Sequence, residues 1–136
     1  MPTPEARVER RRLLASEPNP GAQLDYLVIL DAELGSIGAV DVHVRIAYVP
    51  DRDIVQPGAL EAYLALTSKQ PWLSLEALAL AVLDDINNEI VPRWIMVQLK
   101  GGRRVGEPQR IKHGVTVEDR QPGWANAELL AQLERS

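Results

Sequence analysis

The stretch from residue 40 to residue 92 constrains the fold more strongly than any other part of the chain. Apolar and polar residues alternate along its first nine positions, and side chains alternate between the two faces of a strand. The alternation therefore predicts a half-buried strand over residues 40–48. Its apolar face comprises Val40, Val42, Val44, Ile46 and Tyr48, and its other face comprises Asp41, His43, Arg45 and Ala47.

A second strand is predicted just before this one. Residues 24–34 are rich in strand-forming residues, although residues 27–30 are apolar on both faces. Gly35-Ser36-Ile37-Gly38 makes the turn between the two segments. The pair is therefore predicted to be an antiparallel hairpin.

Two helices follow the hairpin. Pro57 suits the first turn of a helix, where its missing N–H donor is not needed, and Gln70-Pro71 ends that helix. Ser74 is predicted to cap the second helix, and Pro92 stops it. The apolar stripe of the second helix comprises Leu75, Leu78, Val82, Ile86 and Ile90, while Asp84, Asp85, Asn87 and Asn88 are expected to face water.

Residues 94–100 and 110–118 have the composition of two further strands, joined by a glycine-rich basic tip at residues 101–106. The expected fold class is α+β, with an antiparallel four-stranded sheet in the order strand, strand, helix, helix, strand, strand and both helices on one face. The other face and the two edges are left uncovered, and exposed edges invite pairing with another chain. Closure into a barrel shared among subunits removes the edges, so a homo-oligomer is expected.

The chain is predicted to comprise three parts. Residues 1–20 form an N-terminal arm, in which the arginines at positions 10–12 lie on a solvated helix face. Residues 21–124 form a single domain. Residues 125–136 form a C-terminal helical tail that uses Leu129, Leu130 and Leu133.

Composition excludes several classes of function. The net charge of -4 argues against nucleic acid as a partner, because phosphate binding needs a basic face. No apolar run is long enough to span a bilayer, so no membrane partner and a cytoplasmic location are expected. The chain has no cysteine and two histidines. Disulfides and thiolate catalysis are therefore excluded, and no metal site is expected.

Several short motifs resemble those of one enzyme family, the NADPH-dependent nitrile reductases of queuosine biosynthesis (the QueF family, within the tunnelling-fold superfamily). The resemblance covers roughly residues 13–124. It implies the tunnelling fold, whose subunits assemble into barrels and bind purines or pterins at subunit interfaces. The matching motifs are Glu17-Pro18-Asn19-Pro20, Tyr48-Val49-Pro50-Asp51, the helix over residues 76–85, Pro92-Arg93, and residues 115–118 and 121–124.

The chain departs from this family at the positions that carry the chemistry. The family's nucleophilic cysteine aligns with Glu33 or with Leu34, and a carboxylate does not form the thioimide that a thiolate forms with a nitrile. The family's catalytic aspartate aligns with Val40, and the adjacent Asp41 lies on the opposite face of the strand. Nitrile reduction by the family's route is therefore excluded.

The family's cofactor motif is also lost. Where the family has lysines that hold the phosphates of NADPH, residues 56–61 of this chain contain a glycine and a glutamate at lysine positions. Glu61 repels a polyanion that a lysine would attract. No cofactor is expected.

Glu76 aligns with the glutamate that anchors the heterocycle in the family. One carboxylate accepts two hydrogen bonds from the amidine edge of guanine or pterin. The family's histidine before it is Leu75 here, so the catalytic pair is halved. The structural alternative is that Glu76 only stabilises the start of its helix through the helix dipole.

The other candidates are chosen for their side-chain chemistry. Histidines and carboxylates transfer protons near neutral pH, and an aromatic ring stacks on a planar ligand. Ordinary exposure, interface hydrogen bonding and core packing are the corresponding structural alternatives. The catalytic candidates are Glu33, His43 and His113, and the substrate-binding candidates are Glu76, Trp72, Arg45 and Asp41.

Three hypotheses of function remain open. The first is an enzyme that binds a purine, deazapurine or pterin-like heterocycle through Glu76 and catalyses a metal-free acid–base step in specialised metabolism. The second is a non-catalytic heterocycle-binding protein or a partner subunit of a tunnelling-fold barrel. The third is a structural oligomer that keeps Glu76 only as a helix-start residue.

Overall fold

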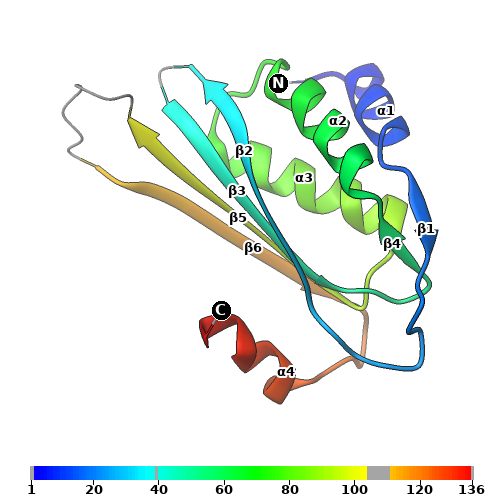
Figure 1. Ribbon diagram of the computed structural model, residues 1–136. Helices are drawn as coiled ribbons and strands as arrows, with labels where there is room; N and C mark the ends of the chain where they lie inside the picture. The colour runs from blue at the N-terminus through cyan, green and yellow to red at the C-terminus, as the bar shows by residue number, and fades with distance from the viewer. Residues whose placement is uncertain (1, 39, 104–110, 136) are drawn as a thin grey trace.

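The computed structural model describes residues 2–38, 40–103 and 111–135, and in these residues it combines four α-helices with antiparallel sheets (Figure 1). The prediction of an α+β chain with an antiparallel sheet is confirmed. The helices are α1 (Pro4–Arg12), α2 (Pro57–Ser68), α3 (Leu75–Ile90) and α4 (Ala127–Ala131), and a 3₁₀ turn, Gln132–Arg135, extends α4. The strands are β1 (Ser16–Pro18), β2 (Val28–Ile37), β3 (Val40–Val49), β4 (Asp53–Val55), β5 (Trp94–Arg103) and β6 (His113–Arg120).

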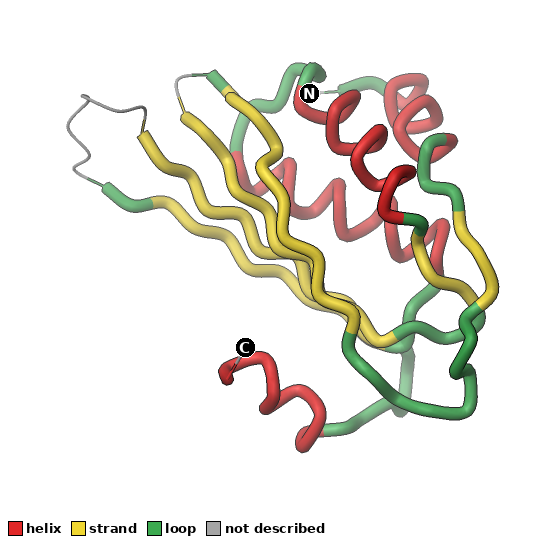
Figure 2. Tube along the Cα trace, in the orientation of Figure 1, coloured by secondary structure: helices red, strands yellow, loops and turns green. Residues whose placement is uncertain are grey.

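The larger sheet has the strand order β2-β3-β5-β6, so β2 and β6 form its edges (Figure 2). Val42, Val44 and Ile46 of β3 are buried, and the residues between them are not. The alternation predicted for residues 40–48 is therefore confirmed for residues 41–46, whereas Ala47, on the other face, is also buried. We call the sheet face opposite α2 and α3 the outer face. In β2, β3 and β5 it carries Ile29, Asp31, Glu33, Asp41, His43, Arg45, Ala47, Trp94, Met96 and Gln98.

A β-bulge changes the first hairpin from what the sequence suggests. The register between β2 and β3 shifts between Glu33 and Gly35, so Leu34 is the extra residue in β2. Gly35 adopts a φ of 115°, a conformation that glycine accepts without strain. The strand β2 starts at Val28 rather than at residue 24. It continues through the bulge to Ile37, so the predicted turn over residues 35–38 is wrong.

The predicted strand over residues 110–118 begins at His113 in the described residues. Residues 104–110, including most of the predicted basic tip, lie outside them.

The two central helices pack on one face of the sheet, α2 against β2 and α3 against β5 and β6. As predicted, Pro57 opens α2, and the side chain of Ser74 accepts a hydrogen bond from the backbone N–H of Ala77 at 3.0 Å. The helix α3 ends at Ile90. Its C-cap residue, Val91, adopts a left-handed conformation with a φ of 49° and is followed by Pro92. The buried stripe of α3 contains all five predicted residues.

Asp85 contradicts the prediction that it faces water, because its exposed fraction is 0%. Its carboxylate accepts hydrogen bonds from Nε of Arg10 at 2.8 Å, Nε of Arg11 at 2.8 Å and the hydroxyl of Tyr63 at 2.6 Å. Burial raises the pKa of Tyr63 well above 10.0, which keeps it a neutral donor. A buried carboxylate is tolerated only when it is paired and hydrogen-bonded in this way.

The same contacts correct the expectation for the N-terminal arm. Arg10 is 3% exposed rather than solvated, and its second nitrogen, Nη1, donates to Gln70 Oε1 at 2.8 Å. The Arg10 guanidinium carbon also lies 5.2 Å from the centroid of the Trp72 ring. The helix α1 is thus fixed to the α2–α3 connection and to α3 by a buried ion pair.

The outer face is less open than the sequence indicates. The helix α4 lies on the opposite side of the sheet from α1, α2 and α3 (Figure 1). Its residues Leu129 and Leu130, and Leu133 in the following turn, pack against a cluster formed by Ala47, Val49 and Trp94. The predicted C-terminal helix therefore exists, and it covers the end of the face that was expected to be bare.

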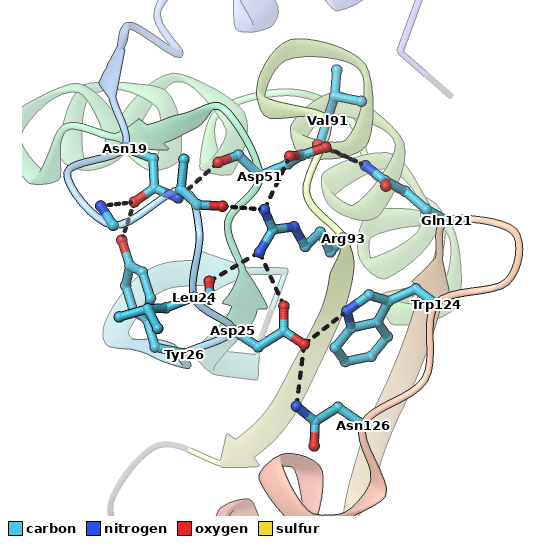
Figure 3. Close-up of polar contacts among 12 residues, drawn as sticks. Asn19, Leu24, Asp25, Tyr26, Asp51, Val91, Arg93, Gln121, Trp124 and Asn126 are labelled. Carbon is cyan, nitrogen blue, oxygen red and sulfur yellow. Dashed lines mark hydrogen bonds and ion pairs between the residues drawn. The ribbon is translucent and has the colours of Figure 1, made fainter.

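Arg93 joins four segments at the base of the sheet (Figure 3). Its Nη1 donates to Asp25 Oδ1 at 3.0 Å and to the Leu24 carbonyl at 2.9 Å, and its Nη2 lies 3.4 Å from Asp51 Oδ1. Asp51 also accepts a hydrogen bond from Gln121 Nε2 at 3.1 Å. The predicted family motifs around Asp51, Arg93 and Gln121 thus meet in one polar cluster.

Replacing Asp85 with alanine is predicted to destabilise the chain by about 3–5 kcal/mol, because it leaves Arg10 buried without a counter-charge. Urea unfolding measures the effect. The neighbouring substitution Asp84→Ala is the control, because Asp84 is exposed and surface changes of this kind stay within about 0.5 kcal/mol. Equal losses of stability in the two variants would contradict the role assigned to Asp85.

Candidate functional site

The candidate residues fall into two groups on opposite sides of the sheet. Glu76 and His113 lie together on the helix side, at the end of the molecule where α3 begins. Glu33, His43 and Arg45 lie together on the outer face. Within one chain the sheet separates the two groups.

Glu76 contacts His113. Its Oε1 atom lies 3.1 Å from His113 Nε2, and the two side chains are 60% and 48% exposed. Thirty-seven positions separate these residues in the sequence, so no local motif predicts the pair. An exposed carboxylate with an imidazole partner can accept hydrogen bonds from a ligand and exchange a proton with it.

The close approach of α3 to the sheet places Glu76. A Cβ atom on Gly101 would lie 2.8 Å from Val40 Cγ1 and 3.2 Å from Leu75 Cδ1. A side chain at this position of β5 would collide with Val40 and crowd Leu75, so the glycine leaves room for Leu75 to pack on the sheet. Leu75 is 7% exposed, and its packing fixes the first turn of α3, which carries Glu76 outward.

A hollow of about 430 Å³ lies beside this pair. The β2–β3 hairpin forms one wall, and the connection between α2 and α3 forms the other. Leu73 is 80% exposed at its rim, so the hollow offers apolar surface, and one of its lining residues, His113, contacts Glu76. That combination is typical of small-molecule sites. The lining residues are Ile37, Gly38, Val40, Trp72, Leu73, Ser74, Leu75 and His113.

Trp72 takes part in packing as well as in lining the hollow. Its indole Nε1 donates to the carbonyl of Thr67 at 2.7 Å, which caps the end of α2. It also lines the groove between α1 and α3. The ring is therefore held in a fixed orientation at the edge of the hollow.

The outer-face group is a cross-strand network. Strand pairing sets Glu33 opposite His43 and Asp31 opposite Arg45. His43 Nδ1 lies 2.9 Å from Glu33 Oε1, and His43 Nε2 lies 3.2 Å from Asp31 Oδ1. Arg45 donates to both oxygens of Asp31, at 2.9 and 3.2 Å. Asp31 was not a candidate, although its two-residue spacing from Glu33 places both carboxylates on one face of β2.

These contacts shift the pKa values within the network. The hydrogen bond with Glu33 is the largest cause that raises the pKa of His43 above 6.5, and Asp31 adds to it while burial opposes it. The hydrogen bonds from Arg45 lower the pKa of Asp31 below 3.8. The imidazolium form of His43 is thus favoured, and both ring nitrogens face a carboxylate.

The structure also shows the position of Asp41, the remaining candidate on the outer face. Asp41 Oδ1 accepts a hydrogen bond from the Ser36 hydroxyl at 2.6 Å, near the end of the hairpin. The bulge at Leu34 separates the two positions that align with the family's cysteine. Glu33 is exposed on the outer face, whereas Leu34 is 4% exposed in the core.

No family model matches the chain. Two curated proteins, from two strains of Acidithiobacillus ferrooxidans, are each 31% identical to it over 121 residues, which covers 85% of this chain and 82% of each relative. Both carry the name NADPH-dependent 7-cyano-7-deazaguanine reductase. The chain belongs to the 7-cyano-7-deazaguanine reductase family.

The segment that aligns with the reductase family's NADPH lysines forms the start of α2. Helix α2 contains no lysine or arginine, and Glu61 is exposed in its second turn. A phosphate-rich cofactor needs cationic or backbone N–H donors. Helix α2 therefore offers no side-chain cation to hold a phosphate.

Two general features of the described residues bear on partners. Every helix within residues 2–38, 40–103 and 111–135 is too short or too polar to cross a lipid bilayer. In the same residues, no three histidine or acidic side chains converge in a way that would hold a metal ion.

The contact between Glu33 and His43 predicts that the stability of the folded chain depends on pH. The pKa of His43 in the folded chain is expected to lie above 6.5, so its stabilising contribution is complete below pH 6.5 and is lost as the pH rises through the folded value. Glu33→Gln should lower this pKa more than Asp31→Asn does, and NMR titration of the His43 ring measures both. A His43 pKa that neither substitution changes would contradict the network.

Proposed function

We propose that this member of the reductase family binds a purine, deazapurine or pterin-like heterocycle through Glu76, and that it no longer reduces nitriles. One observation carries the proposal: Glu76 projects from the first turn of α3, is 60% exposed, and contacts His113 beside a hollow with apolar walls. The family relationship supports it, because the named substrate of the two relatives is a deazaguanine.

The geometry suits a planar, nitrogen-rich ring. The Glu76 carboxylate can accept two hydrogen bonds from neighbouring ring and amino N–H groups. The helix dipole favours a negative charge at this first turn. Leu75, Trp72 and Ile37 offer apolar surface for the ring faces. His113 then stands beside the carboxylate, where it can give or take a proton.

The reaction must differ from that of the reductases. A chain without cysteine has no thiolate to add to a nitrile carbon. The start of α2 lacks the lysines that would hold the phosphates of the hydride donor NADPH. An acid–base step, such as a hydrolysis, an aldol-type cleavage or a tautomerisation, needs only groups that the chain retains, and His113 beside Glu76 is the best-placed proton carrier.

We further propose that the chain adopts the tunnelling fold and assembles into a homo-oligomeric barrel. The free edges of β2 and β6 support this proposal, because edge pairing between copies removes both of them. Such an assembly places the site at a subunit interface. His113 lies on the edge strand β6, so edge pairing at β6 brings a second copy next to the contact between His113 and Glu76.

A binding protein without catalysis is the second candidate. The contacts of His43 favour it, because Glu33 and Asp31 occupy both ring nitrogens and leave that histidine no free acceptor for a substrate proton. In that case Glu76 and the hollow hold a ligand for a partner subunit, and turnover is absent while binding persists.

Calorimetry with guanine, 7-cyano-7-deazaguanine and pterin tests the anchor. Glu76→Gln is predicted to weaken binding roughly 10- to 100-fold, because a hydrogen bond to a charged group contributes about 1.5–3 kcal/mol. Glu5→Gln is the matched control, since Glu5 is also an acid in the first turn of a helix. Equal affinity in Glu76→Gln and the unmodified chain would refute the anchor, whereas turnover of a bound ring would distinguish an enzyme from a receptor.

NADPH is predicted to show no saturable binding in the same instrument. The reason is the missing positive charge on α2. Gly58→Lys combined with Glu61→Lys should create measurable affinity if the backbone of the cofactor site persists. Micromolar binding of NADPH by the unmodified chain would show that the cofactor site is retained.

A further inference from the structure

A groove of about 470 Å³ lies between α1 and α3, on the helix side of the sheet. The described residues that line it include neither Glu76 nor His113, and none from the edge strands β2 and β6. The groove is therefore distinct from the proposed heterocycle site and leaves both edges to the proposed barrel. Its volume falls within the range of roughly 300–1,000 Å³ that is usual for small-molecule sites.

Helix α3 gives the groove an apolar wall. Ala77, Leu80 and Ala81 are spaced by three and four positions, so their side chains share one face of the helix. Leu80 is 51% exposed, although it belongs to a well-packed helix. The ring of Trp72 adjoins this wall. Apolar surface is thus available to a ligand along the side of α3.

Helix α1 gives the groove a cationic wall. Thr3, Arg7 and Arg11 line it and recur every four positions. Arg7 is exposed and forms no ion pair within the described part of the chain. Arg11 uses its Nε atom to bind Asp85 at 2.8 Å, and its side chain is 23% exposed. A guanidinium carries five N–H donors, so the terminal nitrogens of both arginines can bind a ligand.

The charge of the lining is positive, whereas the whole chain has a net charge of -4. The lining includes three arginines (residues 7, 10 and 11) and two aspartates (residues 84 and 85). Asp85 is 0% exposed and already binds two of these arginines. Asp84 is exposed and also lines a neighbouring hollow, so its carboxylate lies toward one end of the groove. The local charge therefore favours an anion.

We propose that the groove between α1 and α3 binds a small organic anion that joins an apolar or aromatic body to a carboxylate or phosphate group. The body packs on Leu80, Ala77 and the edge of Trp72, and Arg7 and Arg11 bind the charged group. Arginine suits both anions, because two parallel N–H groups meet two oxygens. This inference does not depend on the proposed heterocycle site.

Calorimetry with naphthoate and naphthyl phosphate tests the proposal, and the tighter binder shows which anionic group the groove prefers. Naphthamide lacks the charge, and acetate and inorganic phosphate lack the apolar body, so all three should bind more weakly. Arg7→Gln is predicted to weaken the tighter anion roughly three- to tenfold. Arg12→Gln is the matched control, because Arg12 is an exposed residue of α1 outside the groove. Asp84→Asn should strengthen binding, since it removes a like charge.

The indole N–H signal of Trp72, followed by NMR, locates the bound anion, because Trp72 lines the groove. The signal should shift with the midpoint that calorimetry gives. Glu76→Gln should leave this midpoint unchanged, which separates the groove from the proposed heterocycle site. The proposal is overturned if neither anion binds saturably, if naphthamide binds as tightly, or if Arg7→Gln and Arg12→Gln have equal effects.

Discussion

The hydrogen bonds of the Arg93 guanidinium are the interactions on which the arrangement of the remaining elements depends. Arg93 lies at the start of β5 and bonds to the loop before β2 and to the turn after β3. Asp25 and Asp51 extend these bonds to the segment that follows β6. One side chain thus fixes the base of the sheet, the entry of the first hairpin and the docking of α4. At the opposite end of the sheet, the described residues include the Glu76–His113 contact and the hollow beside it.

Local patterns predicted the central fold well. Period-two alternation identified β3, and Pro57, Ser74 and Pro92 bounded α2 and α3, because each of these residues acts on its own backbone. Burial of Asp85 could not be predicted, since it depends on Arg10, which is 75 residues away. The bulge at Leu34 is likewise invisible in the composition of its strand. The sequence contained the leucines of α4 but not the face of the sheet on which they pack.

The candidate site was predictable only in part. Glu76 could be chosen from its place in a family motif, and its partner could not, because β6 brings His113 to it across the fold. The absence of cysteine from the chain, and of lysine and arginine from α2, is legible in the sequence itself. The pairing of Glu33 with His43 follows from strand register, which the bulge sets. The picture that results is a member of the reductase family in which Glu76 and His113 lie beside an apolar hollow.

The most direct test of this account follows the ring signals of the two histidines by NMR while 7-cyano-7-deazaguanine is added. His113 lines the hollow and contacts Glu76, and His43 lies on the other side of the sheet. The account predicts that the His113 signals shift as the ligand binds, and that Glu76→Gln moves the midpoint of this shift to ligand concentrations roughly 10- to 100-fold higher. An unchanged midpoint in Glu76→Gln, or no shift of His113 while the ligand binds, would contradict it.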